Sequence, residues 1–120
     1  MVNFVPGGGS ILGVGDKLVS TVTGFFTLDG ITSNGTTILP LGSRILVKDL
    51  SNLAHNGVYN LTDCGAVGSN WELTRASDYN AAPFVNQGDS ILVLGGVTNA
   101  LSTWIQITKM VTMNTTNITF

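Results

Sequence analysis

The chain has 120 residues, a formal net charge of −2 and few charged residues, 10% against roughly 25% in an average soluble domain. This length predicts one domain with a single hydrophobic core. The Lys and Arg residues lie far apart in the sequence, which argues against nucleic-acid binding, because phosphate binding requires clustered cations. The sequence has no apolar run close to the roughly 18 residues of a membrane helix, so we expect no membrane insertion.

The N-terminal part of the chain, residues 1–15, is rich in glycine and contains the run Pro6-Gly7-Gly8-Gly9-Ser10. This composition predicts a flexible lead-in that lies outside the core. Residues 16–120 are then expected to form a single β domain.

From residue 16 onward, short runs rich in Val, Ile and Thr are separated by turn signals. The turn signals are pairs that contain glycine and supply the positive φ of tight turns: Asp29-Gly30, Asn34-Gly35, Asn56-Gly57 and Gly95-Gly96. No stretch of ten or more residues shows the 3.6-residue period of a helix. We therefore predict an all-β fold, in the form of a small antiparallel β-sandwich or a flattened barrel.

Two apolar runs of strand length are continuous rather than alternating, Ile45-Leu46-Val47 and Ile91-Leu92-Val93-Leu94. Such runs are typical of strands that are covered on both faces. In a domain of this size, a neighbouring subunit could provide the second cover. We expect Leu92 to be a core residue on this basis.

The segment Thr103–Thr108 alternates and predicts a strand with one buried face. Ile105 and Ile107 lie on one face of this strand, and Trp104 and Gln106 lie on the other. We expect Trp104 to contribute to the core.

One ordered series of residues is more specific than these single signals. It consists of Leu41–Asp49, Asn56–Tyr59, Trp71–Asp78, Gln87–Val93, Thr98–Ala100 and Trp104. The series resembles the small β domain of bacteriophage tail-fibre proteins and of the tips of trimeric bacterial fibre adhesins, including the C-terminal domains of collagen-like adhesins. The resemblance extends from about Leu18 to Thr108.

The resemblance implies an extracellular attachment module, at the tip of a virion tail fibre or of a bacterial cell-surface fibre. It also implies a homotrimer that binds a cell-surface glycan or a surface protein of a host or prey cell. The alternative is a purely structural module, which trimerises and terminates the fibre without a ligand of its own.

Residues that carry catalytic chemistry are scarce. The single histidine, His55, lies in a turn segment, and the single cysteine is Cys64. This pair is too small a ligand set for a zinc site, and a lone cysteine forms no intrachain disulfide. Most carboxylates lie beside glycine or at strand ends, where Asp hydrogen-bonds its own turn. We expect no enzyme activity, no metal site and no cofactor.

Recognition residues are expected in loops, because loops carry function on a rigid β scaffold. Tyr79 and Asn80 lie in one such loop, and Asn99 lies in another. An aromatic ring and amide groups suit the apolar face and the hydroxyls of a neutral sugar. We predict that Tyr79, Asn80 and Asn99 contribute to one shallow ligand-binding site per subunit. The alternative is that these loops order one another or are buried between subunits.

Arg75 and Asp78 flank Ala76-Ser77 in the part of the series that matches most closely. A partly buried arginine is rarely unpaired. We therefore predict that Arg75 and Asp78 form a structural pair, with Arg75 holding the loop through Asp78 or through a backbone carbonyl.

Overall fold

The computed structural model describes residues 10–12, 16–50 and 52–120. Its strands, in chain order, are β1 (Ser10–Leu12), β2 (Lys17–Ser20), β3 (Thr27–Leu28), β4 (Ile31–Thr32), β5 (Arg44–Val47), β6 (Gly57–Asp63), β7 (Glu72–Arg75), β8 (Ser90–Val93) and β9 (Ser102–Ile105). Two single 3₁₀ turns, η1 (Leu53–His55) and η2 (Ala82–Phe84), accompany them. All these strands pair in antiparallel fashion. The predicted all-β fold is confirmed.

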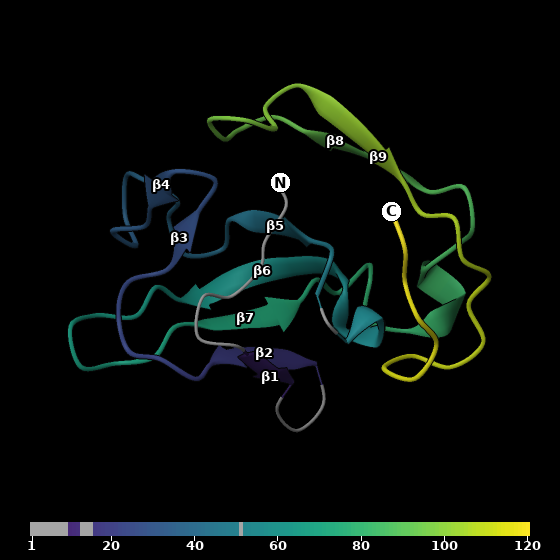
Figure 1. The fold of residues 1–120 in the computed structure, drawn as a ribbon, viewed down its shortest axis with the longest axis horizontal. Helices are drawn as coiled ribbons and strands as arrows, with labels where there is room; N and C mark the ends of the chain where they lie inside the picture. The colour runs from purple at the N-terminus through teal and green to yellow at the C-terminus, as the bar shows by residue number, and fades with distance from the viewer. Residues whose placement is uncertain (1–9, 13–15, 51) are drawn as a thin grey trace.

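The strands form one larger sheet and two hairpins (Figure 1). The sheet has the order β1-β2-β7-β6-β5, while β3–β4 and β8–β9 are two-stranded. In Figure 1 the β8–β9 hairpin arches over the β5 edge of the sheet. The Asp29-Gly30 and Gly95-Gly96 signals lie in the turns of the two hairpins, as expected.

One face of the five-stranded sheet forms the hydrophobic core. Leu18, Leu73 and Leu61 are paired directly across β2, β7 and β6, and all three are fully buried. The next row pairs Ile45 of β5 with Tyr59 of β6, which are also fully buried. Because side chains alternate between the two faces of a strand, this register collects the largest apolar residues on one side.

The opposite face of the sheet is polar over β2, β7 and β6. Lys17 Nζ lies 3.4 Å from Glu72 Oε1, and the hydroxyls of Thr62 and Thr74 lie 3.0 Å apart. A strand with one wet and one dry face is typical of antiparallel sheets. The sheet therefore presents its polar side to solvent in this region.

The two continuous apolar runs have different surroundings. Ile45-Leu46-Val47 is buried in its entirety, so both faces of β5 are covered within the chain. In the second run Val93 is fully buried, whereas Leu92 and Leu94 are more than half exposed. The expectation that Leu92 is a core residue is wrong, because alternation along β8 places its side chain on the face opposite Ile91 and Val93, where it is more than half exposed.

In β9 and the residues that directly follow it, the buried face is the one that carries Trp104 and Gln106. Gln106 is fully buried, Trp104 packs against the edge of the core, and Lys48 Nζ lies 4.1 Å from the centroid of the Trp104 ring. Ile105 and Ile107 are exposed on the other face.

The predicted lead-in, residues 1–15, contains one described segment, Ser10–Leu12. This segment is β1 and pairs with β2, so the sheet begins inside that range. The rest of the predicted lead-in lies outside the described residues. In the part of the chain that the structure describes, no helix has the length and apolar character needed to cross a membrane.

Candidate functional site

Arg75, the last residue of β7, is buried and bound by backbone oxygens. Its guanidinium donates hydrogen bonds to Ala54 O at 2.9 Å and to Asn56 O at 3.0 Å, and its Nε donates to Asn114 Oδ1 at 3.1 Å. The group also lies 5.0 Å from the centroid of the Tyr59 ring. Burial lowers the pKa of Arg75. Arg75 thus joins β7 to the η1–β6 junction and to the C-terminal segment, which is a structural role.

Asp78 does not contact Arg75 and instead forms a bidentate pair with Arg44. Both hydrogen bonds are 2.9 Å long, and both side chains are more than half exposed. These bonds lower the pKa of Asp78. The predicted pair of Arg75 and Asp78 does not form: Arg75 binds backbone carbonyls, which was the stated alternative to Asp78, and Asp78 binds Arg44. The reason is the register: Arg75 lies opposite Tyr59 on the core face, whereas Arg44 lies on the polar face beside Asn60.

Tyr79 is buried rather than presented to solvent. Its ring packs against the backbone at Gly57, where an added Cβ would come within 3.3 Å of the ring. Its hydroxyl has no hydrogen-bond partner among the described residues, and burial raises the pKa of Tyr79. Tyr79 therefore cannot stack on a ligand as predicted. The sequence correctly predicted that Tyr79 lies in a loop. Its ring is nevertheless buried, because Gly57 has no side chain and leaves space for the ring in the interior.

Asn99 lies in the tip of the β8–β9 hairpin, and this tip is fastened to the β3–β4 turn by Asp29. The Asp29 carboxylate accepts hydrogen bonds from the backbone N–H of Thr98 at 3.0 Å and of Asn99 at 2.9 Å. The backbone N–H of Val97 donates to Asp29 O at 3.1 Å. The bonds to Thr98 and Asn99 lower the pKa of Asp29, since they favour the ionised carboxylate. The sequence identified Asp29 as a turn former and contained no signal for this long-range contact.

The predicted ligand residues do not form one site. Figure 1 shows the β8–β9 tip beside β4, at the opposite end of the molecule from the loop between β7 and η2. Tyr79 and Asn80 belong to that loop, and Asn80 is partly exposed. Asn99 is therefore the one predicted ligand residue that lies at the hairpin tip.

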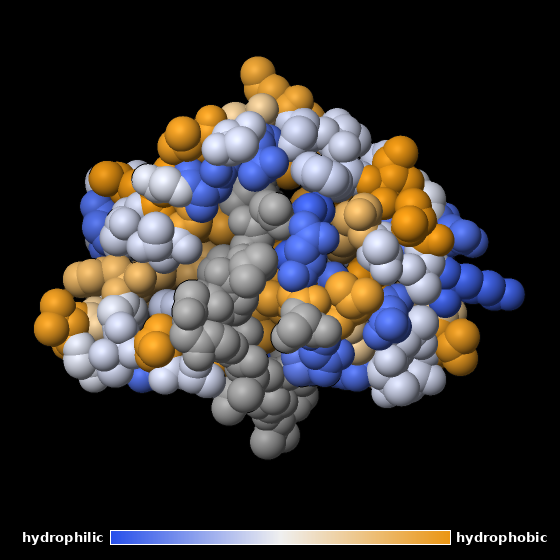
Figure 2. Space-filling view, in the orientation of Figure 1, coloured by the Kyte–Doolittle hydropathy of each residue, from blue (hydrophilic) through white to orange (hydrophobic). Residues whose placement is uncertain are grey.

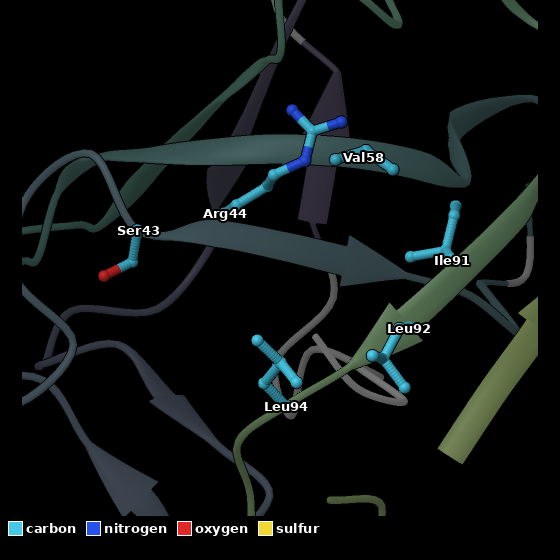
Figure 3. A pocket seen from close by; sticks show the side chains of 6 residues that line it. All are labelled: Ser43, Arg44, Val58, Ile91, Leu92 and Leu94. Atoms are coloured by element: carbon cyan, nitrogen blue, oxygen red, sulfur yellow. The ribbon is translucent and has the colours of Figure 1, made fainter. Parts of the chain in front are cut away.

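An apolar pocket of about 280 Å³ lies between β5 and β8 (Figure 3). Its lining consists of Ser43, Arg44, Val58, Ile91, Leu92 and Leu94. In Figure 3 the Arg44 guanidinium points away from Leu92 and Leu94, and it is already paired with Asp78. The pocket can hold an apolar group, and its lining offers no free acid or base.

The described residues offer little other chemistry. They contain no group of three or more His, Cys, Asp or Glu side chains that could hold a metal ion. Partial burial, with a smaller contribution from Arg75, lowers the pKa of His55. Cys64 is partly buried and packs against the core.

Comparisons of this chain with protein-family models, with curated proteins and with solved structures found no match. The resemblance to fibre-tip domains thus depends on the ordered series of residues alone. In the structure, this series occupies β5, the start of β6, β7 and most of the β8–β9 hairpin.

Proposed function

We propose that this chain is a non-catalytic attachment domain at the tip of an extracellular trimeric fibre, either a phage tail fibre or a bacterial surface fibre. Its ligand is a neutral cell-surface glycan or a surface protein, bound at the tip of the β8–β9 hairpin. The observation that supports this proposal is the Asp29 contact, which orders an exposed loop before any ligand binds.

The order of the tip matters because binding is weakened by the entropy lost when a mobile loop is fixed. Val97 and Thr98 are exposed at this tip, and Asn99 is partly exposed. No charged residue occurs between Asp89 and Lys109, and the Asp29 carboxylate beside the tip already accepts hydrogen bonds from the backbone of Thr98 and Asn99, so the tip favours an uncharged ligand. A weak site of this kind gains avidity when several copies act on one fibre.

The test is binding of the purified chain to a glycan array and to intact cells. Thr98→Ala and Asn99→Ala are expected to weaken binding, because they remove polar side chains at the tip and leave the core intact. Asn80→Ala is the matched control, since Asn80 lies at the other end of the molecule, and it should bind like the parent. Undiminished binding by both tip variants would contradict the proposed site.

The second candidate is the purely structural module, and the burial of Tyr79 favours it. The predicted site loses its aromatic residue, so the loop after β7 lacks the stacking surface that a sugar site uses. In this case the parent would bind no glycan and no cell surface, although it would still assemble.

A further inference from the structure

We infer that the outer face of the β8–β9 hairpin is covered by a second copy of this chain. This outer face consists of Leu92, Leu94, Leu101, Ile105 and Ile107, which are 57%, 71%, 79%, 51% and 58% exposed. The inference concerns assembly, and it does not depend on the proposed ligand recognition at the hairpin tip.

The hairpin is apolar on both of its faces. Ile91 is paired with Trp104, and these residues pack toward the core together with Val93. Leu92 is paired with Thr103, and alternation places Leu92 and Ile105 on the opposite surface. Figure 2 shows apolar atoms along the edge of the molecule that Figure 1 assigns to this hairpin. Strands that are apolar on both faces are typical of sheets covered on both sides, and the described chain covers one side of this hairpin.

Leu101 has a backbone conformation that is unfavourable for leucine. Its φ is +63°, in the left-handed region where glycine and asparagine are accommodated more easily. Its side chain is the most exposed member of the outer face, so burial within the described chain does not offset this cost. Contact with another copy would bury the side chain and compensate for the conformation.

The outer face provides a large part of the apolar area that one partner of a subunit interface contributes. A large aliphatic side chain has roughly 60–120 Å² of apolar area to bury, so five that are more than half exposed present about 300 Å². One partner of a stable interface contributes about 450–500 Å² of apolar area. The pocket between β5 and β8 shares Leu92 and Leu94 with the outer face and adds the partly exposed Ile91 to the apolar surface.

The charge and the edges of the hairpin favour a second copy as the occupant. No charged residue lies between Asp89 and Lys109, so nothing here selects a nucleic acid, an anionic lipid or a charged peptide. In the described part of the chain, β8 and β9 pair with each other and with no other strand. Neither strand contains the Lys or Pro that blocks pairing between exposed edges. A second copy supplies an uncharged apolar surface and free strand edges of its own.

The test compares the mass of the full chain with that of the variant Leu92→Thr/Ile105→Thr by sedimentation equilibrium. Threonine preserves strand preference while it removes apolar surface. The parent is expected to be an oligomer, and this variant a monomer with the circular dichroism spectrum of the parent. The matched control is Val67→Thr/Val111→Thr, which removes two exposed valines outside the hairpin and should retain the parent mass.

A second variant distinguishes weaker association from misfolding. Leu101→Asn suits the left-handed conformation, so it should fold and yet dissociate at higher concentration than the parent. A parent that is monomeric at every concentration would overturn the inference. An unchanged mass of the Leu92→Thr/Ile105→Thr variant would also overturn it. A monomeric parent that co-sediments with phosphatidylcholine vesicles would overturn it too and assign the face to a lipid surface.

Discussion

At the scale of single residues, Tyr59 and Tyr79 show how the same side chain is buried in two different ways. The Tyr59 hydroxyl donates a hydrogen bond to His55 O at 2.6 Å, whereas the Tyr79 hydroxyl has no such partner among the described residues. Burial raises the pKa of Tyr59 to about 12. The two residues therefore form a natural comparison for the value of one buried hydrogen bond.

We predict that Tyr59→Phe lowers the free energy of unfolding by about 1–2 kcal/mol, because His55 O loses its partner in a partly buried site. Tyr79→Phe should change it by less than about 0.5 kcal/mol, because no hydrogen bond is lost. Urea titrations of both variants at neutral pH provide the measurement. Equal losses in the two variants would show that the Tyr79 hydroxyl is bonded after all.

The raised pKa of Tyr59 has a second consequence, at alkaline pH. The neutral phenol is favoured in the folded chain, so its contribution is complete below the ordinary tyrosine pKa of about 10. It is lost as the pH rises from there through about 12. Tyr59→Phe should make the stability of the chain less dependent on pH in this window, as measured by thermal unfolding.

At the scale of elements, adjacent residues of β7 lie on opposite faces of the sheet, one in the core and the next on the polar face. Leu73 is fully buried between Leu18 and Leu61, whereas Thr74 lies on the polar face. We predict that Leu73→Ala lowers the free energy of unfolding by about 2–5 kcal/mol through loss of buried area and creation of a cavity. Thr74→Ala in the same strand should cost less than about 1 kcal/mol. Similar losses for both, in chemical denaturation, would contradict the register of β7.

The contact between the β3–β4 turn and the β8–β9 tip should respond to acid. The pKa of Asp29 is lowered in the folded chain, so the contact is complete above the ordinary aspartate value of about 3.9 and is lost as the pH falls through the lower folded value. The amide signals of Thr98 and Asn99 in NMR spectra are therefore expected to shift in this acidic range. Asp29→Asn should abolish the titration, and a midpoint above the ordinary value would refute the assignment.

At the scale of the whole molecule, the proposed association between copies of the chain links stability to protein concentration. Anything that binds the folded state alone raises its apparent stability by mass action. We predict that the Tm of the parent increases with protein concentration, while the Tm of Leu92→Thr/Ile105→Thr does not. Differential scanning calorimetry over a dilution series measures both, and a constant parent Tm would argue against association.

Local patterns in the sequence predicted the all-β fold, the turns at Asp29-Gly30 and Gly95-Gly96, and the burial of β5. These features depend on the apolar period of two and on turns such as Asp29-Gly30, which neighbouring residues specify. The same patterns could not determine which face of β9 is buried, because Trp104 and Ile105 are both apolar. The buried face of β9 is determined by how the hairpin packs on the core beneath it.

The sequence by itself determined the class of fold and the scarcity of catalytic groups. The tertiary structure decided the partners of Arg75, the burial of Tyr79 and the attachment of Asn99 to Asp29. The physical reason is distance along the chain: Asp29 and Asn99 are separated by 70 positions, and Arg75 binds Asn114 across 39. Such contacts depend on how the hairpins and the C-terminal segment pack on the sheet, and no local pattern of residues encodes that packing.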